Sequence, residues 1–212
     1  MRWEEFVNIT GNLPIIEPEI LLAGTFKIEP VKVQISRWVK VGKLIQLKRG
    51  VYALAEPFRK ISIYEPYAAS VLKKPSYLSL EKALEYYNMI PEAVSVYTSV
   101  TTKRPGKFTC RMGVFDYRHI KTSLFWGYKS ITVNNQTGFV ATPEKALLDF
   151  FYLKRLRITF EYLKELRLQN LNMINLNILF EYGQMFKKPG ILSVCKMIKE
   201  YVEIEKDEEK IL

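Results

Sequence analysis

Apolar and polar positions repeat with a helical period between residues 31 and 40. On a wheel at 100° per residue, one arc of about 100° collects the apolar side chains, namely Val31, Ile35, Trp38 and Val39. The opposite side collects a hydroxyl and three cations, namely Ser36, Lys32, Arg37 and Lys40. Pro30 suits the first helical position, where a missing N–H costs nothing. Gly42 suits the left-handed conformation that ends many helices. The pattern predicts an amphipathic helix with a basic outer face.

Two short apolar runs come directly after this helix. Residues 44–47 and 51–54 are rich in strand formers, and Gly50 between them can adopt the positive φ of a tight turn. We expect a β-hairpin with Lys48 and Arg49 projecting from its tip. A helix followed at once by a basic hairpin is the arrangement that winged helix-turn-helix domains use on DNA.

Two further helices are expected before this pair. Residues 2–9 place Trp3, Phe6 and Val7 on one face. Residues 17–23 form the second helix, with Gly24 at its end and three residues facing inward, namely Ile20, Leu21 and Leu22. One small core should collect the inward side chains, namely Trp3, Phe6, Ile20, Leu21, Ile35, Trp38 and Leu44. We therefore expect a winged helix-turn-helix domain at 1–58. A unit of this size is marginally stable alone, so it should pack against the rest of the chain.

The remainder, 59–212, is expected to be a C-terminal α/β domain. Helices are predicted at 65–73 and 79–88, with Ser76 or Ser79 as the N-cap. Residues 94–102 alternate with period two, which predicts a strand with one apolar face. Further strands are expected at 108–117, 128–133 and 139–141, with a loop at 134–138. Because the connections look too short for crossovers, the sheet should be mainly antiparallel.

The C-terminal third reads as helical. Thr142 is expected to cap a buried helix, with Pro143 in its first position and Glu144 at the positive end of the helix dipole. More helices are expected at about 160–168, 172–186 and 190–205, with residues 203–210 frayed. The fold class is therefore α+β: an N-terminal winged helix-turn-helix, then an α/β domain with a helical C-terminus.

Charge points to a polyanionic partner. The chain has a formal net charge of +10, and residues 26–60 hold nine Lys and Arg against two Glu, a net of +7. Such a concentration is what a phosphate-binding surface requires. The expected partner is double-stranded DNA, namely an operator with possible inverted repeats, bound by a monomer or a weak dimer.

Other compositional features narrow the location and the cofactors. No run approaches the ~20 apolar residues of a membrane span, and the acidic N-terminus argues against export, so we expect a cytoplasmic protein with no membrane association. Cys110 and Cys195 lack metal-ligand spacing, and His119 is the only histidine. We therefore expect neither a metal nor a cofactor.

The residues expected to bind DNA come from the basic helix and the hairpin, namely Lys32, Gln34, Ser36, Arg37, Lys40, Lys43, Lys48 and Arg49. Arg37 should read guanine through two hydrogen bonds or contact a phosphate. Lys48 and Arg49 should contact phosphates, or Arg49 should enter the minor groove. Trp38 and Tyr52 are expected to pack inward rather than stack on bases.

Several motifs resemble those of the AbiEi family, antitoxin-type transcriptional regulators of bacterial and archaeal abortive-infection systems. In the first domain they are Arg37-Trp38, Gly42-Lys43-Leu44-Ile45 and Arg49-Gly50-Val51-Tyr52. In the second they are the segments 79–84, 99–103 and 142–149, in the family's order. The resemblance implies a winged helix with an α/β domain, repression of the protein's own operon, and a functional link to a nucleotidyltransferase-like toxin. Residues 155–212 carry no matching motif.

Two alternatives remain open beside the regulator. The domain could be a non-catalytic module that binds protein or RNA, since fold alone does not fix function. The weaker alternative is a metal-dependent nuclease using Asp116, Glu144 and Lys145. Glu144 already has a role at a helix start, Lys145 reads as a helix-surface residue, and Asp149 would form an ordinary i,i+4 pair with it. Because no nucleophile, base and orienting group occur together, we expect no enzymatic activity.

Overall fold

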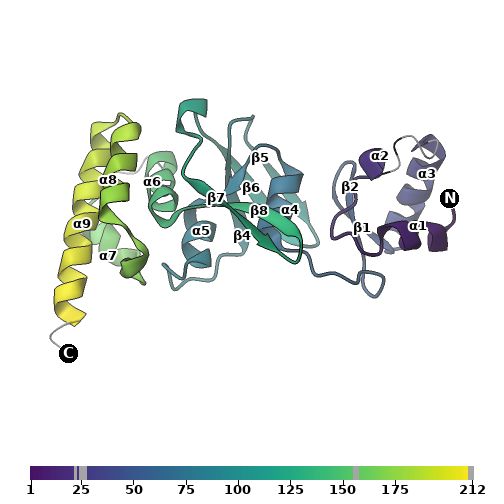
Figure 1. Cartoon of the computed structure of the whole chain (residues 1–212), viewed down its shortest axis with the longest axis horizontal. Coiled ribbons are helices and arrows are strands. Elements are labelled where there is room, and N and C mark those ends of the chain that lie inside the picture. The colour runs from purple at the N-terminus through teal and green to yellow at the C-terminus, as the bar shows by residue number, and fades with distance from the viewer. Residues whose placement is uncertain (22, 24–27, 155–157, 210–212) are drawn as a thin grey trace.

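The computed structural model describes residues 1–21, 23, 28–154 and 158–209. The molecule is elongated, with α1 (Trp3–Thr10) and α9 (Pro189–Glu209) at opposite ends (Figure 1). At the N-terminal end, α1 is followed by α2 (Pro18–Leu21), α3 (Ile28–Lys40) and a hairpin of β1 (Leu44–Lys48) and β2 (Val51–Leu54). The expected order of three helices and a hairpin is therefore present in an α+β chain.

Local chemistry explains where α3 ends. Gly42 has φ +75°, the left-handed conformation predicted for it. The N–H of Gly42 donates to the carbonyl of Val39 at 3.1 Å, and that of Lys43 donates to the carbonyl of Trp38 at 2.9 Å. These two bonds form a Schellman motif, which satisfies the last carbonyls of the helix. The start was predicted less well, because α3 begins at Ile28 and Pro30 is its third residue, still inside the first turn.

The small N-terminal core contains most of the expected side chains. Phe6, Val31, Ile35, Trp38 and Leu44 are buried in it together with Ile16 and Leu54, and Trp3 and Leu21 pack against its rim. Ile20 was placed here wrongly, since it is 69% exposed. The helix carrying it is a single turn, too short for the predicted inward stripe, and Leu22 and Gly24 lie outside the described residues.

The hairpin lies between the N-terminal helices and the central sheet (Figure 1). Gly50 has φ +78° at its tip, as predicted. Leu44 and Leu54 face the small core, whereas Leu47, Val51 and Ala53 belong to the larger core of the rest of the chain. The N-terminal unit is thus packed against the sheet, and β1 contacts β5.

The central sheet has six strands in the order β5-β6-β4-β3-β8-β7. They are β3 (Tyr77–Leu78), β4 (Val96–Thr101), β5 (Gly106–Cys110), β6 (Gly113–His119), β7 (Tyr128–Val133) and β8 (Gln136–Ala141). The sheet is mixed rather than mainly antiparallel, because β3 pairs with β8 and β4 with β6 in parallel. The prediction failed because β4 and β6 are neighbours while β5, between them in sequence, lies outside both.

Three details of the strands differ from the predictions. The single strand expected at 108–117 is a hairpin of β5 and β6, with a turn before Gly113. The expected loop at 134–138 is only a two-residue turn, in which Asn134 and Asn135 have φ of +49° and +60°. On β4 both faces are covered, since Ser99 and Thr101 are 0% exposed like Val100. The alternation of polar and apolar residues on β4 therefore does not separate an exposed face from a buried one.

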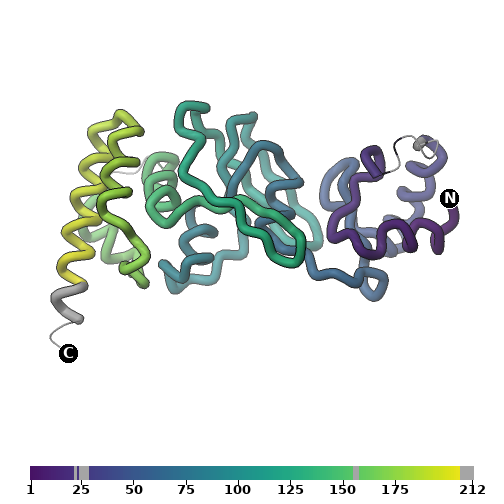
Figure 2. The backbone as a smooth tube through the Cα atoms, viewed as in Figure 1, coloured from purple at the N-terminus to yellow at the C-terminus, as the bar shows by residue number. Residues whose placement is uncertain are grey.

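Helices surround the sheet and form the other end of the molecule. They are α4 (Glu65–Leu72), α5 (Leu80–Tyr86), α6 (Pro143–Lys154), α7 (Phe160–Glu165), α8 (Leu176–Met185) and α9. Short 3-10 turns occur at Thr122–Leu124 and Leu171–Met173. α4 packs on β8 and β3, and α6 lies between the sheet and the C-terminal helices (Figure 2). Residues 203–209 belong to α9 rather than to a frayed end, while residue 210 lies outside the described residues.

The N-caps of two helices were predicted with different success. Thr142 does cap α6, where its hydroxyl accepts the N–H of Lys145 at 3.3 Å. Ser79 occupies the N-cap position of α5 but makes no capping bond, and Ser76 donates to the carbonyl of Lys73 at 2.6 Å. The hydroxyl of Ser79 is used elsewhere, in a buried cluster described below.

Candidate nucleic-acid interface

The outer face of α3 is the most exposed set of polar groups predicted to bind DNA. Lys32, Ser36, Arg37 and Lys40 are all exposed, while Gln34 at the flank is half-buried. The opposite face holds Val31, Ile35 and Trp38 in the small core. Burial of that apolar face fixes the rotation of the helix, so the polar groups point away from the protein.

The cations on this face are not equivalent. Lys32 lies 3.0 Å from Glu19 and 3.0 Å from Glu29, and hydrogen bonding to Glu29 and then Glu19 raises the pKa of its ammonium. These pairs link α2 to α3 and neutralise Lys32. Within the described residues, Arg37 and Lys40 pair with no carboxylate. They are therefore the α3 cations left to meet a partner.

The two cations of the hairpin, Lys48 and Arg49, lie in different surroundings. Arg49 is exposed at the tip. Lys48 instead turns toward the sheet, where its ammonium donates to the carbonyl of Leu72 at 2.7 Å and lies 5.9 Å from the centre of the Phe108 ring. The expectation that both project from the tip is therefore wrong for Lys48. Lys43 is half-buried, with its ammonium 5.0 Å from the centre of the Trp3 ring.

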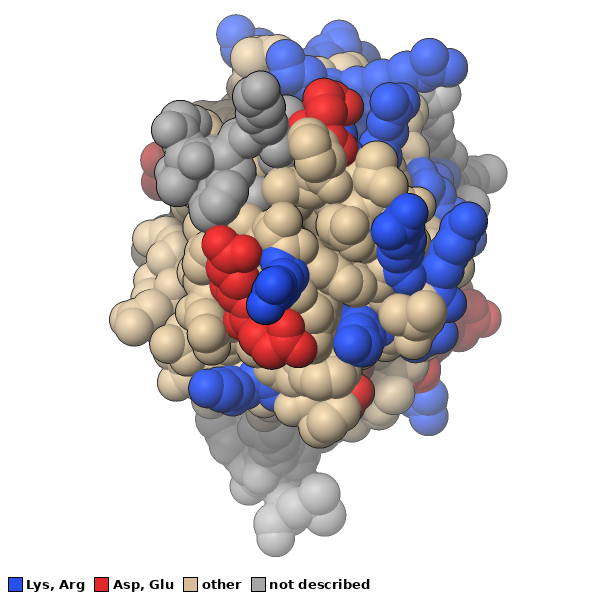
Figure 3. Space-filling view, turned by 90° about the vertical axis from the view of Figure 1, so that its right-hand side faces the viewer, with Lys and Arg blue, Asp and Glu red and all other residues tan. Residues whose placement is uncertain are grey.

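Figure 3 views the molecule from its N-terminal end. Lys and Arg side chains gather along the top and the right of this face, while acidic side chains with a basic one between them cross it to the left of its centre. Two apolar residues missed by the sequence reasoning belong to the exposed surface near α3, since Val33 is 54% and Val41 68% exposed. The helical wheel could have predicted the exposure of Val33, because it places Val33 on the same side of the helix as Lys40 and Arg37. Exposed methyl groups on such a face suit contact with thymine methyls. Trp38 is buried and Tyr52 half-buried against the small core, as expected.

A second group of polar side chains is buried inside the larger core. Lys145 and Asp149 on α6 are both 0% exposed and form an ion pair. Tyr77 and Ser79 donate their hydroxyls to the other oxygen of Asp149, each at 2.9 Å. The Lys145 ammonium lies 4.8 Å from the centre of the Trp126 ring and 5.0 Å from that of Phe186. Lys145 is thus no surface residue, contrary to the sequence interpretation.

Burial governs the ionisation of this cluster. Desolvation lowers the pKa of Lys145, opposed by Asp149, and it raises the pKa of Asp149, opposed by Lys145 and the two hydroxyls. Every polar group in it has a partner, and the ring of aromatics closes it off. These contacts therefore hold α6 against β3 and against the segments that carry Trp126 and Phe186.

The acidic residues considered for a nuclease have separate partners. Asp116 pairs with Arg118 at 2.8 Å, and Glu144 accepts the N–H of Asn175 at 2.8 Å. In the described part of the chain, no three His, Cys, Asp or Glu side chains gather as a metal site would need. No described helix is long and apolar enough to cross a membrane.

The chain was compared with known proteins. Neither the known protein families nor the curated proteins include a match to it.

Proposed function

We propose that the protein is a sequence-specific DNA-binding transcriptional regulator, with α3 as the recognition helix and the β1–β2 hairpin as the wing of a winged helix-turn-helix. The exposed face of α3 carries this proposal. Arg37 and Lys40 lie on this face beside Ser36 and Val33, and neither cation pairs with a carboxylate among the described residues. Guanidinium, hydroxyl and methyl groups together supply what base edges in the major groove recognise. Arg49 at the hairpin tip would add a phosphate or minor-groove contact.

The two cations of the hairpin differ in whether they are available to DNA. Lys48 holds the hairpin against α4, so the wing is fixed in relation to the sheet, and Arg49 is its exposed cation. Arg37, Lys40 and Arg49 then form a set of three cations available to DNA. With Arg37 on a base, Lys40 and Arg49 neutralise two phosphates, which gives a slope of about −1.8 for log K against log salt concentration.

The test is duplex binding measured by fluorescence anisotropy over a series of salt concentrations, with DNA from upstream of the protein's own coding sequence and a scrambled duplex. Arg37→Ala should weaken binding to the preferred duplex by about 5- to 150-fold, as expected for 1–3 kcal/mol per bidentate contact. It should weaken binding to the scrambled duplex less.

The matched control is Lys196→Ala, which removes one positive charge from an exposed position on α9, at the other end of the molecule (Figure 1). Its affinity should stay within about twofold of the parent, because screening limits the reach of a distant charge. Equal losses from the two substitutions, or binding that ignores salt, would refute DNA recognition by α3. Binding that ignores salt would favour the protein-binding module instead.

The resemblance to AbiEi regulators extends the proposal to an antitoxin that represses its own operon. Upstream DNA bound more tightly than scrambled DNA would support self-repression. Rescue of growth when the chain is co-produced with a toxic nucleotidyltransferase-like neighbour would support the toxin link, and continued growth arrest would oppose it.

A further inference from the structure

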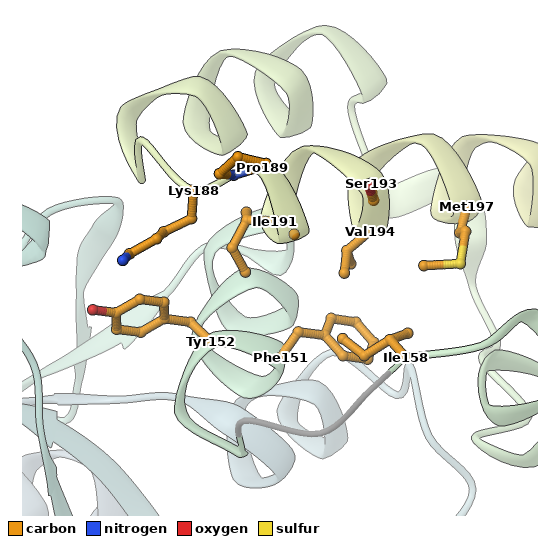
Figure 4. Close-up of a pocket in the computed structure, with 10 residues that line it drawn as sticks. Phe151, Tyr152, Ile158, Lys188, Pro189, Ile191, Ser193, Val194 and Met197 are labelled. Atoms are coloured by element: carbon orange, nitrogen blue, oxygen red, sulfur yellow. The ribbon is translucent and has the colours of Figure 1, made fainter.

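An apolar pocket of about 410 Å³ lies between α6 and α9, far from the proposed DNA interface. Its apolar lining comes from the end of α6, from Ile158 and from one face of α9, namely Phe151, Ile158, Pro189, Ile191, Val194 and Met197. Figure 4 shows the α9 side chains above the pocket and the other two below it. Ile191, Val194 and Met197 are spaced three residues apart, so they form a row of about 9 Å at 1.5 Å per residue.

Two polar groups stand at one end of this row. Lys188 and Tyr152 reach the same end of the pocket, with the ammonium and the hydroxyl on the side away from Met197 (Figure 4). Lys188 is exposed, and among the described residues no carboxylate pairs with it. The Tyr152 ring contacts Phe186 at a centroid distance of 5.2 Å, while its hydroxyl has no hydrogen-bond partner in the described chain. Both donors are therefore available to a ligand.

The local electrostatics add to the positive character of this end. The 21-residue helix α9 begins at Pro189 with no acidic residue in its first turn, and Lys187 and Lys188 come directly before it. Positive side chains are unfavourable at the positive end of a helix dipole. Within the portion of the chain that the structure describes, neither an acid nor an ion pair compensates them. An anion held at Lys188 would supply that compensation.

We propose that this pocket binds a small amphipathic carboxylate, a medium-length alkyl chain with one anionic end. The carboxylate accepts hydrogen bonds from Lys188 and Tyr152, and the alkyl chain lies against Pro189, Met197 and Ile158. The buried side chains of Phe151, Ile191 and Val194 form the floor beneath it. A concave apolar site with a few polar groups gathered at one end is the usual form of a small-molecule site. The proposal is independent of DNA binding.

The experiment uses the full chain labelled with ¹³C in its methionine methyl groups. The chain has six methionines, and Met197→Leu identifies the Met197 signal in the NMR spectrum. Sodium octanoate should shift that signal saturably, with a dissociation constant on the order of 0.1–1 mM for a ligand of this size. Octyltrimethylammonium, which has the same tail and the opposite charge, should bind at least tenfold more weakly.

Two charge reversals, one just before α9 and one on it, distinguish a specific site from general electrostatic attraction of the anion to the protein. Lys188→Glu should weaken octanoate binding at least tenfold, whereas Lys196→Glu, with the same change of net charge at another exposed position, should change it less than twofold. Tyr152→Phe should weaken it severalfold. No saturable shift of the Met197 signal, an equal response to both amphiphiles, or unchanged affinity in Lys188→Glu would overturn the proposal.

Discussion

At the scale of single residues, the ion pair of Lys145 and Asp149 gives a sharp expectation for stability. Both side chains are fully buried, and Asp149 also accepts hydrogen bonds from Tyr77 and Ser79. Removing one partner of a buried pair leaves an uncompensated charge, which costs about 3–5 kcal/mol. Lys145→Met should therefore lower the free energy of unfolding by that amount, as measured by urea denaturation.

The control for that pair is Lys199 with Glu203, which has the same i,i+4 spacing on α9 but is about half exposed. Because an exposed pair contributes little, Lys199→Met should cost less than about 0.5 kcal/mol. The double variant Lys145→Met, Asp149→Leu should lose less stability than the sum of its two single variants, since no charge is left unpaired. Additive losses would mean that the two charges do not stabilise each other.

At the scale of elements, the packing of α8 on α9 depends on a glycine. A Cβ atom built at Gly183 would lie 2.5 Å from the sulfur of Cys195, which is itself fully buried. In an open helix, Gly→Ala stabilises by about 1 kcal/mol. Here the clash should outweigh this gain, so Gly183→Ala should lower the unfolding free energy by about 1–2 kcal/mol, within the range for overpacked cores.

Two further variants test whether the clash is the cause. In a Cys195→Ala background the sulfur is gone, so Gly183→Ala should become neutral or stabilising. Gly190→Ala on α9 should also be tolerated, because its Cβ would meet no described atom within 4 Å. If Gly183→Ala destabilises equally in both backgrounds, the contact with Cys195 does not set the helix spacing.

Elements whose cause is local were predictable from the sequence. The end of α3 at Gly42 and the cap of α6 at Thr142 depend on residues within one turn, and both were predicted. The failures needed contacts that are distant in the chain. Lys145 reads as a surface lysine until Tyr77 and Trp126 are seen around it. For the same reason, the sequence placed the exposed face of α3 correctly but not the direction of Lys48.

At the scale of the whole molecule, Lys48 connects the N-terminal unit to the sheet. It donates to Leu72, the last residue of α4, whose carbonyl lies at the negative end of that helix. Lys73 stands beside it, 5.6 Å from the centre of the same Phe108 ring, and burial together with the charge of Lys48 lowers the pKa of Lys73. Two ammonium groups therefore lie over one ring, at the place where the hairpin meets the sheet.

This arrangement gives Lys48 and Arg49 opposite expected roles, although they are adjacent. Lys48→Met keeps most of the aliphatic stem on Phe108 but removes the bond to Leu72, which should cost about 1 kcal/mol. For a chain of this length, the melting temperature should fall by about 2–4 °C. Because its ammonium is already engaged, DNA affinity should change less than about threefold.

Arg49→Ala should leave the melting temperature unchanged and weaken DNA binding by about fivefold or more, with a salt slope smaller by about 0.9. Thermal denaturation and anisotropy on both variants measure the two effects separately. The reverse pattern, with Lys48→Met harming DNA binding and sparing stability, would show that Lys48 leaves Leu72 to meet the phosphates and that the hairpin moves when DNA binds.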